Sequence, residues 1–265
     1  MRKTAAAPQR LSLLYLLAVS IFMKETMNQL SILTIDIGGS RIKATILNQA
    51  GELQTNYIKT DTPSPASPEN VLRAIEFLVK DFPVFDRVSV GFPGYVKDGV
   101  VMTAPNLGTD FWRLFDLRQE LMTLLDKPVR VVNDADLQGL GVVRGKGLEI
   151  VITLGTGFGT ALLHNGYLLP HLELAHHPVT KHKDYDEYIG DRAMKEAGME
   201  KWNSRMQRVL HILQTVFNYD HLYISGGNAD ELSFQLDENI TIVSNIDGIK
   251  GGAMLWQDEF VVATS

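Results

Sequence analysis

The most regular hydrophobic pattern in this chain is a pair of similar segments, each interrupted by a glycine-rich turn. Residues 33–46 read as a β-strand, the turn Gly38-Gly39-Ser40 and a second β-strand, and residues 152–163 repeat this plan around Gly155-Thr156-Gly157. Turns that contain asparagine and glycine close the two copies, at 48–51 and 165–166. Two halves built alike predict two lobes with a cleft between them.

A helix is predicted to begin at Pro68, with Ser67 as its N-cap. It follows three short β runs within 31–58 and a loop at 60–68 that is rich in proline and serine. Helical spacing places its apolar residues on one face, namely Val71, Leu72, Ile75, Leu78 and Val79.

The rest of the chain alternates between predicted strands and helices. We expect strands at 87–91, 129–132, from 149 and at 221–224, and helices at 116–125, 135–143, 184–197, 203–217 and 249–256. The last of these is expected to pack back across the lobes. Such alternation is typical of an α/β fold whose sheet is covered on both faces.

Composition narrows the possible functions. The chain has 265 residues, is 45% hydrophobic, carries a net charge of −6 and contains no cysteine. The mild acidity argues against a general nucleic-acid binder, and the lack of cysteine excludes disulfides, thiolate zinc sites and a cysteine nucleophile.

The first 28 residues have a different character. Basic Arg2, Lys3 and Arg10 precede an apolar run at 11–23 that is short for a membrane span and has the form of a signal peptide. No small-residue cleavage site follows, so we expect an upstream extension from a misassigned start, with Met23 or Met27 as the true beginning. Export is the alternative, and part of the segment is expected to be disordered.

The glycine turns are candidate phosphate sites, because glycine lets the backbone N–H groups come close to phosphate oxygens. Asp36, where the first strand meets its turn, is a candidate ligand for magnesium, directly or through water. The alternative is a tight hairpin that merely tolerates glycine. Arg41 and Lys43 alternate with core residues and are expected to be solvated, although Lys43 is kept as a candidate donor contact.

Two familiar nucleotide-binding patterns are missing. Gly159 follows Gly157 too soon for a dinucleotide fingerprint and strand-like residues come next, and no Gly-Lys-Ser/Thr phosphate loop occurs. Phosphate binding must therefore use another architecture.

Asn133 and Asp134 follow a predicted strand, at the end where open α/β sheets bind ligands. Asp134 is a candidate general base that takes the proton of a sugar hydroxyl during phosphoryl transfer. The alternative is that Asp134 only caps the helix from Ala135.

Histidines and a carboxylate gather at 171–178. A zinc site is one possible use, but the order differs from His-Glu-x-x-His and no cysteine completes a set. The preferred use is hydrogen bonding with sugar hydroxyls, in which the Glu173 carboxylate accepts and the His176 imidazole donates. His171, His177 and His182 are left without a role.

Seven motifs, in order, resemble those of the ROK family of sugar kinases and repressors, and within it the polyphosphate glucokinase-like branch. The motifs are Asp36-Ile37-Gly38-Gly39-Ser40, Gly91-Phe92-Pro93-Gly94, Ala104-Pro105-Asn106-Leu107, Asn133-Asp134, Leu154-Gly155-Thr156-Gly157, Glu173-Leu174-Ala175-His176 and Ser225-Gly226-Gly227-Asn228. The likeness runs from about residue 31 to 256, and its specificity lies in the order and spacing of the motifs. Ser40 replaces the family's usual threonine, and the cysteine-rich zinc loop of many relatives is missing.

The resemblance implies an α/β fold of the two-lobed, actin-like ATPase (ribonuclease H-like) type with a central cleft. It implies phosphorylation of glucose at its 6-hydroxyl with Mg²⁺ and with Asp134 as base. The implied sugar contacts are Asn106, Asn133, Glu173, His176 and, by a weaker match, Glu187. The implied donor contacts are Asp36, Gly38, Gly39, Ser40, Lys43, Gly155, Thr156, Gly157, Gly226 and Gly227.

Polyphosphate-using members of the family also lack the zinc loop, so the resemblance favours inorganic polyphosphate as donor, with ATP as an alternative or additional one. No zinc is expected. A polyanion needs a basic channel, for which the candidates are Arg113, Arg118, Lys127, Arg144 and Lys146. The alternatives are a kinase for another hexose or an N-acyl amino sugar, and a sugar sensor without turnover. No room is left for the helix-turn-helix of repressor relatives, and neither nucleic acid nor a membrane is expected as a partner.

The expected organisation is a leader at 1–30, an N-terminal lobe at 31–134 and a C-terminal lobe at 135–265 whose last helix packs back on the first lobe. From the family likeness we expect a cytoplasmic homodimer.

Overall fold

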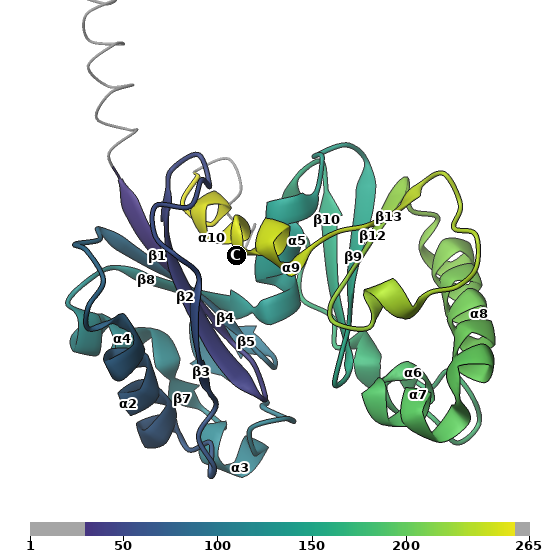
Figure 1. Ribbon diagram of the computed structural model, residues 1–265, viewed down its shortest axis with the longest axis horizontal. Helices are drawn as coiled ribbons and strands as arrows, with labels where there is room; N and C mark the ends of the chain where they lie inside the picture. Colours follow the sequence, from purple (N-terminus) through teal and green to yellow (C-terminus); the bar gives the residue numbers. More distant parts are fainter. Residues whose placement is uncertain (1–29, 258–265) are drawn as a thin grey trace, which may run out of the picture.

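The computed structural model describes residues 30–257, so the predicted leader lies outside the described residues. Two five-stranded sheets stand side by side in it (Figure 1). The first has the order β3-β2-β1-β4-β8 and the second β11-β10-β9-β12-β13. Their strands are β1 (Ser31–Ile37), β2 (Arg41–Asn48), β3 (Ile58–Asp61), β4 (Arg87–Phe92), β8 (Val129–Asn133), β9 (Leu148–Leu154), β10 (Phe158–His164), β11 (Tyr167–Leu168), β12 (His221–Ser225) and β13 (Ile240–Ile242).

The two sheets are built on one plan, which confirms the predicted repeat. In each, an antiparallel hairpin (β1-β2 or β9-β10) is followed by two strands paired in parallel (β4-β8 or β12-β13). Asn165 and Gly166 both have positive φ, 52° and 85°, as a tight two-residue turn requires. The glycine turns therefore occupy equivalent ends of the two hairpins.

Helices cover both faces of the sheets. The helices α2 (Pro68–Val79) and α4 (Leu117–Leu125) share the core of the first sheet, and α8 (Met199–Phe217) covers the outer face of the second (Figure 1). Helix α5 (Asp134–Val142) packs on the other face of the second sheet, against β9 and β10, and also contacts β4. The predicted cap of α2 is confirmed, because Ser67 Oγ accepts a hydrogen bond from the Asn70 N–H at 3.4 Å.

The remaining elements are short. They are β5 (Val96–Lys97), β6 (Val100–Val101), β7 (Phe115–Asp116), α3 (Thr109–Trp112), η1 (Leu174–His176), α6 (Tyr185–Ile189), α7 (Asp191–Ala197), η2 (Ala229–Glu231), α9 (Asn245–Ile249) and α10 (Gly251–Met254). No helix within residues 30–257 is long and apolar enough to cross a membrane.

Several predicted boundaries were wrong. The helix expected at 184–197 is broken at Gly190, whose extended backbone separates α6 from α7. Helix α8 starts at Met199 rather than 203, and β3 lies partly in the expected loop at 60–68. The helix expected at 249–256 is shorter, since α10 spans Gly251–Met254, and a separate helix, α9, precedes it and ends before Lys250.

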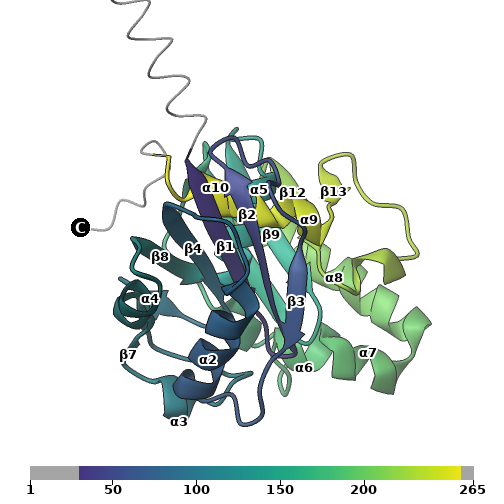
Figure 2. The same ribbon diagram turned by 60° about the vertical axis from the view of Figure 1, so that its left-hand side comes forward.

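The last described segment returns to the first sheet. Helix α10 contacts β1, β4 and α5, and Figure 2 shows it beside these elements. Ser89 Oγ of β4 donates a hydrogen bond to the Gly252 carbonyl at 2.6 Å and accepts one from Trp256 Nε1 at 2.9 Å. A Cβ at Gly251 would overlap the Leu137 carbonyl oxygen, so only glycine permits α10 to approach α5 so closely.

Candidate active site

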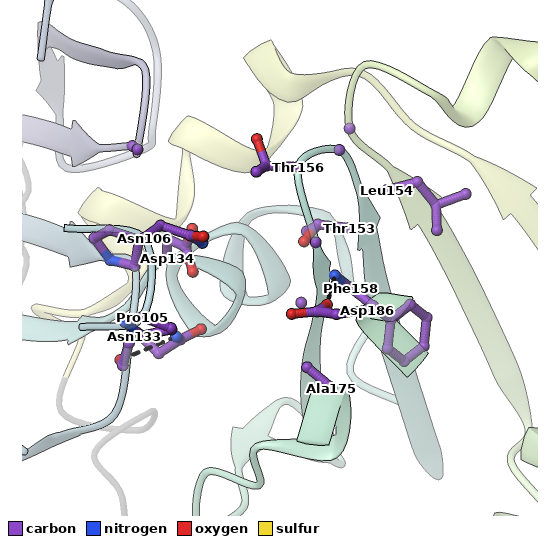
Figure 3. A pocket seen from close by; sticks show the side chains of 18 of the residues that line it. Pro105, Asn106, Asn133, Asp134, Thr153, Leu154, Thr156, Phe158, Ala175 and Asp186 are labelled. Carbon is purple, nitrogen blue, oxygen red and sulfur yellow. Dashed lines mark hydrogen bonds between the residues drawn. The ribbon is translucent and has the colours of Figure 1, made fainter. Parts of the chain in front are cut away.

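A cavity of about 480 Å³ lies between the two sheets, and Figure 3 shows residues from both sides facing it. Most of the predicted site residues line it. They are Gly38, Gly39, Ser40, Lys43, Asn106, Asn133, Asp134, Gly155, Thr156, Gly157, Glu173, His176, Gly226 and Gly227. Asp36 and Glu187 are not among its lining residues. One cavity thus brings together motifs that are far apart in the sequence.

Asp134 is the first residue of α5, but Asn133 is its N-cap. Asn133 Oδ1 accepts hydrogen bonds from the N–H groups of Ala135, at 2.8 Å, and Asp136, at 3.4 Å. Asn133 Nδ2 donates to the Gly94 carbonyl at 3.1 Å, so this side chain is committed to the protein itself. The alternative in which Asp134 serves only as the cap is therefore wrong.

The carboxyl group of Asp134 faces the cavity in a setting that favours its protonated form. Burial raises its pKa to about 7, helped by the negative charges of Asp36, Asp136 and Glu173 and opposed by a hydrogen bond from the Ala135 N–H. A carboxylate with a pKa near neutrality is suited to accept a proton at physiological pH.

Asp36 is the second-last residue of β1 and is 8% exposed. Lys43 is its register partner in β2, and Lys43 Nζ donates a hydrogen bond to Asp36 Oδ2 at 2.9 Å. The expectation that Lys43 is solvated was wrong, because the register turns its side chain toward Asp36 and leaves it 26% exposed. Burial lowers the pKa of Lys43, but the charge and hydrogen bond of Asp36 outweigh this and the net shift is upward. Lys43 therefore remains a cation at the cavity wall.

The second and third glycine turns present open backbone to the cavity. At Gly155 and Gly227 an added Cβ would meet no atom within 4 Å, so a bound group has space beside them. The Asn228 N–H donates to the Leu154 carbonyl at 3.1 Å, which holds the third turn against the second. The first turn touches Asn106, whose Cβ would lie 3.2 Å from a Cβ at Gly39.

Asp186, which the sequence analysis missed, lines the cavity in place of Glu187. Its Oδ1 accepts a hydrogen bond from the Phe158 N–H at 2.6 Å (Figure 3). Glu187 is exposed, and its carboxylate accepts the Asp184 N–H at 3.3 Å in a capping box at the start of α6. An acidic residue at the N-cap with glutamate three positions later was the available signal.

His171, which was left without a role, is buried between two carboxylates. Its side chain is 8% exposed, with Nδ1 3.0 Å from Asp136 Oδ2 and Nε2 3.6 Å from Glu173 Oε1. Burial lowers the pKa of His171, but the interactions with Asp136 and Glu173 outweigh it and raise the pKa to about 10. The view of His171 as part of a partly exposed, idle loop is therefore wrong.

The basic residues that line the cavity are Arg41 and Lys43. The five proposed channel residues, Arg113, Arg118, Lys127, Arg144 and Lys146, do not line it. Within residues 30–257, no group of three or more histidine, aspartate or glutamate side chains could hold a metal ion, including the stretch at 171–177 considered for zinc.

Comparisons with known proteins agree with this geometry. The model of the ROK family matches residues 32–172. The polyphosphate glucokinase of Mycobacterium tuberculosis (strain CDC 1551 / Oshkosh) is 35% identical over 239 residues, which cover 83% of this chain and 89% of that protein.

Solved structures show the same fold. The inorganic polyphosphate/ATP-glucomannokinase of Arthrobacter sp. strain KM superposes with a TM-score of 0.77 at 32% identity, covering 85% of this chain and 98% of that one. A ROK family glucokinase from Streptomyces griseus, in complex with glucose and AMPPNP, superposes with a TM-score of 0.72 at 20% identity and covers the same shares. The last likeness concerns the fold alone.

Proposed function

Because this chain belongs to the ROK family, we propose that it transfers a phosphoryl group from inorganic polyphosphate to the 6-hydroxyl of glucose. The relative from M. tuberculosis is named for this activity, and the Arthrobacter protein is named for polyphosphate and ATP as donors. The observation that carries the proposal is the position of Asp134, in one cavity with three glycine turns and with Glu173, His176 and Asp186.

Asp134 acts as the general base. The sugar hydroxyl oxygen forms a bond to the terminal phosphorus of the donor, and its proton passes to the Asp134 carboxylate. The bond from that phosphorus to the bridging oxygen breaks, and the shortened donor leaves with the electron pair. A pKa of about 7 lets Asp134 accept the proton near neutral pH.

The Gly38 N–H is bonded to the Arg41 carbonyl and the Gly155 N–H to the Gly157 carbonyl, so the other backbone N–H groups of the glycine turns hold the donor phosphates. Arg41 and Lys43 offset the charge of these phosphates. The basic residues at the cavity are therefore on the first hairpin rather than among the five candidates from the sequence. ATP is the additional donor, since its terminal phosphates require the same contacts.

The residues fit a magnesium ion bound with the donor. Mg²⁺ is commonly held by one or two carboxylates together with substrate phosphates. Asp36 lies behind Lys43 rather than in the cavity lining, but Lys43 occupies only its Oδ2, so Oδ1 would be left to hold the ion, directly or through water. When bound, the ion would neutralise charge on the phosphate oxygens.

The sugar contacts we propose are Asn106, Glu173, His176 and Asp186, all of which line the cavity. Asn133 also lines it, but its amide is occupied by the cap and by Gly94, so we assign it to holding Asp134 in place. Mannose is a second candidate acceptor, because the Arthrobacter protein is named a glucomannokinase. The cytoplasmic location, the homodimer and the lobe boundary after residue 134 stay predictions.

The test is the initial rate of sugar phosphorylation by protein begun at Met27. Glucose and mannose are each supplied with polyphosphate or with ATP, and Mg²⁺ is present or chelated. We expect glucose 6-phosphate with polyphosphate and a lower rate with ATP. Turnover with ATP alone would reject the donor, and no phosphorylation of any hexose would reject the function.

A further inference from the structure

Glu173 sits in a cavity wall that is rich in negative charge. Its own charge raises the pKa values of Asp134, Asp136 and Asp186. Such repulsion makes an unsupported carboxylate costly here and leaves its orientation poorly defined.

His171 is placed to offset this charge from behind the cavity wall. It does not line the cavity, and its ring is fixed on two sides. Nδ1 lies 3.0 Å from Asp136 Oδ2 in the first turn of α5, and the ring stacks on Tyr95 with centroids 6.1 Å apart and planes inclined by 14°. With Nδ1 engaged, Nε2 points toward Glu173 Oε1 at 3.6 Å.

The two oxygens of Glu173 have different surroundings. Oε1 is buried beside His171 and has no hydrogen bond, and His171 Nε2 likewise has none. The Glu173 side chain is still 30% exposed, so Oε2 is the oxygen left to face the cavity. A positive charge behind Oε1 favours the orientation of the carboxylate in which Oε2 faces the cavity.

We propose that His171 is a positioning residue, which acts through Glu173 by holding the Glu173 carboxylate ready to accept hydrogen bonds from hydroxyl groups of the sugar. Asp136 orients the imidazole, and His171 places its positive charge behind Oε1 of Glu173. This inference rests on the proposed function, because the ligand is the hexose of that reaction.

The test measures glucose binding by calorimetry without a phosphoryl donor, so that it does not depend on catalysis. The variants are His171→Asn, Glu173→Gln and the double variant, with His182→Asn, an exposed histidine in the same region, as the matched control. We expect His171→Asn to weaken glucose binding about tenfold, and His182→Asn to leave it unchanged. Because His171 acts through Glu173, the double variant should bind no more weakly than Glu173→Gln alone. Unchanged affinity in His171→Asn, or fully additive losses, would overturn the inference.

Steady-state kinetics provide a second test of the role of His171. His171→Asn should raise KM for glucose by a larger factor than it lowers kcat, whereas a general loss of structure would lower the active fraction and leave KM unchanged. Circular dichroism checks the fold of each variant. If His171→Asn does not fold, Asp136→Asn takes its place and should weaken glucose binding in the same direction, and unchanged affinity would reject the inference.

The two proposals fail differently. Wild-type protein that neither binds nor phosphorylates a hexose would reject both. Wild-type protein that phosphorylates glucose, with His171→Asn equal to it in KM and affinity, would reject the role of His171 alone.

Discussion

Asn133 caps helix α5 so that its neighbour Asp134 does not have to. The Asn133 side chain bonds the N–H groups of Ala135 and Asp136 and also reaches the Gly94 carbonyl of the loop after β4. Asp134 Oδ1 accepts only a local hydrogen bond from the Ala135 N–H, at 2.9 Å, so its Oδ2 is available to the cavity. Asn133 thus fixes the start of the helix, and Asp134 presents its carboxyl group to the cavity.

Replacing Asp134 by asparagine removes the proposed base and keeps the size of the side chain. We expect kcat for glucose phosphorylation to fall by roughly 10²- to 10⁴-fold, with a small change in KM for glucose. Initial rates at saturating donor measure this. A variant that keeps full kcat would remove Asp134 from the mechanism.

The pH dependence of activity should report the raised pKa of Asp134. The base works when deprotonated, so kcat/KM should rise with pH and level off above about 7. Glu173→Gln removes one of the charges that raise this pKa, and the acid limb should then move to lower pH even where the rate itself is reduced. A limb that stays in place would show that the titrating group is not Asp134.

The free energy of unfolding should also depend on the protonation of Asp134, but it should fall as the pH rises. The pKa of Asp134 is higher in the folded than in the unfolded chain, so the folded state binds a proton more tightly. The resulting stabilisation is full below the ordinary aspartate pKa and is lost as pH rises through about 7. Denaturant unfolding at pH 4 to 8 should show a weaker pH dependence in Asp134→Asn than in the wild type. Parallel curves for the two proteins would contradict this.

Asp186 and Glu187 are adjacent acidic residues, and substituting each in turn tests which one contacts the sugar. Asp186 lines the cavity, whereas Glu187 closes the capping box of α6. Asp186→Asn should raise KM for glucose severalfold, and Glu187→Gln should leave KM unchanged at a cost of about 1 kcal/mol or less in stability. Steady-state kinetics on both variants decide the assignment, and the reverse pattern would restore Glu187 as the sugar contact.

Loss of the Asn133 cap should destabilise the fold. Asn133→Ala leaves two N–H groups and the Gly94 carbonyl without these partners, and we expect the free energy of unfolding to fall by about 1 kcal/mol or more. Asn133→Asp keeps the acceptor and is the control, with a smaller loss. Equal midpoints for wild type and Asn133→Ala in urea would argue against a structural role.

Much of the fold could be predicted from residues that are close together in the sequence. The two hairpins, the Ser67 cap and the turn at Asn165-Gly166 depend on neighbours in the chain, and each is present. The cavity also gathers Asp134 and the glycine turns, which were marked because they stand at a strand end or in turns, and Glu173, which was marked because it lies among histidines and matches a family motif.

The side-chain positions that the sequence did not predict depend on contacts between distant segments. Which way Lys43 points follows from its register with Asp36, and whether His171 is buried follows from α5, which supplies Asp136. Asp186 faces the cavity from the first turn of α6, where its Oδ1 accepts the Phe158 N–H of β10, a contact between distant segments that periodicity does not show. Such features require the fold to be known first.

The return of α10 to the first sheet bears on how the protein is made. Strands β1 and β4 leave the ribosome early, but the residues that cover Thr34 and Ser89 are Gly252 and Trp256, among the last of the described chain to be synthesised. During translation this face of the sheet stays uncovered until more than half of the protein has been synthesised after it. This face of the nascent chain is therefore uncovered over that interval, and the first lobe is completed only after the second sheet has been synthesised.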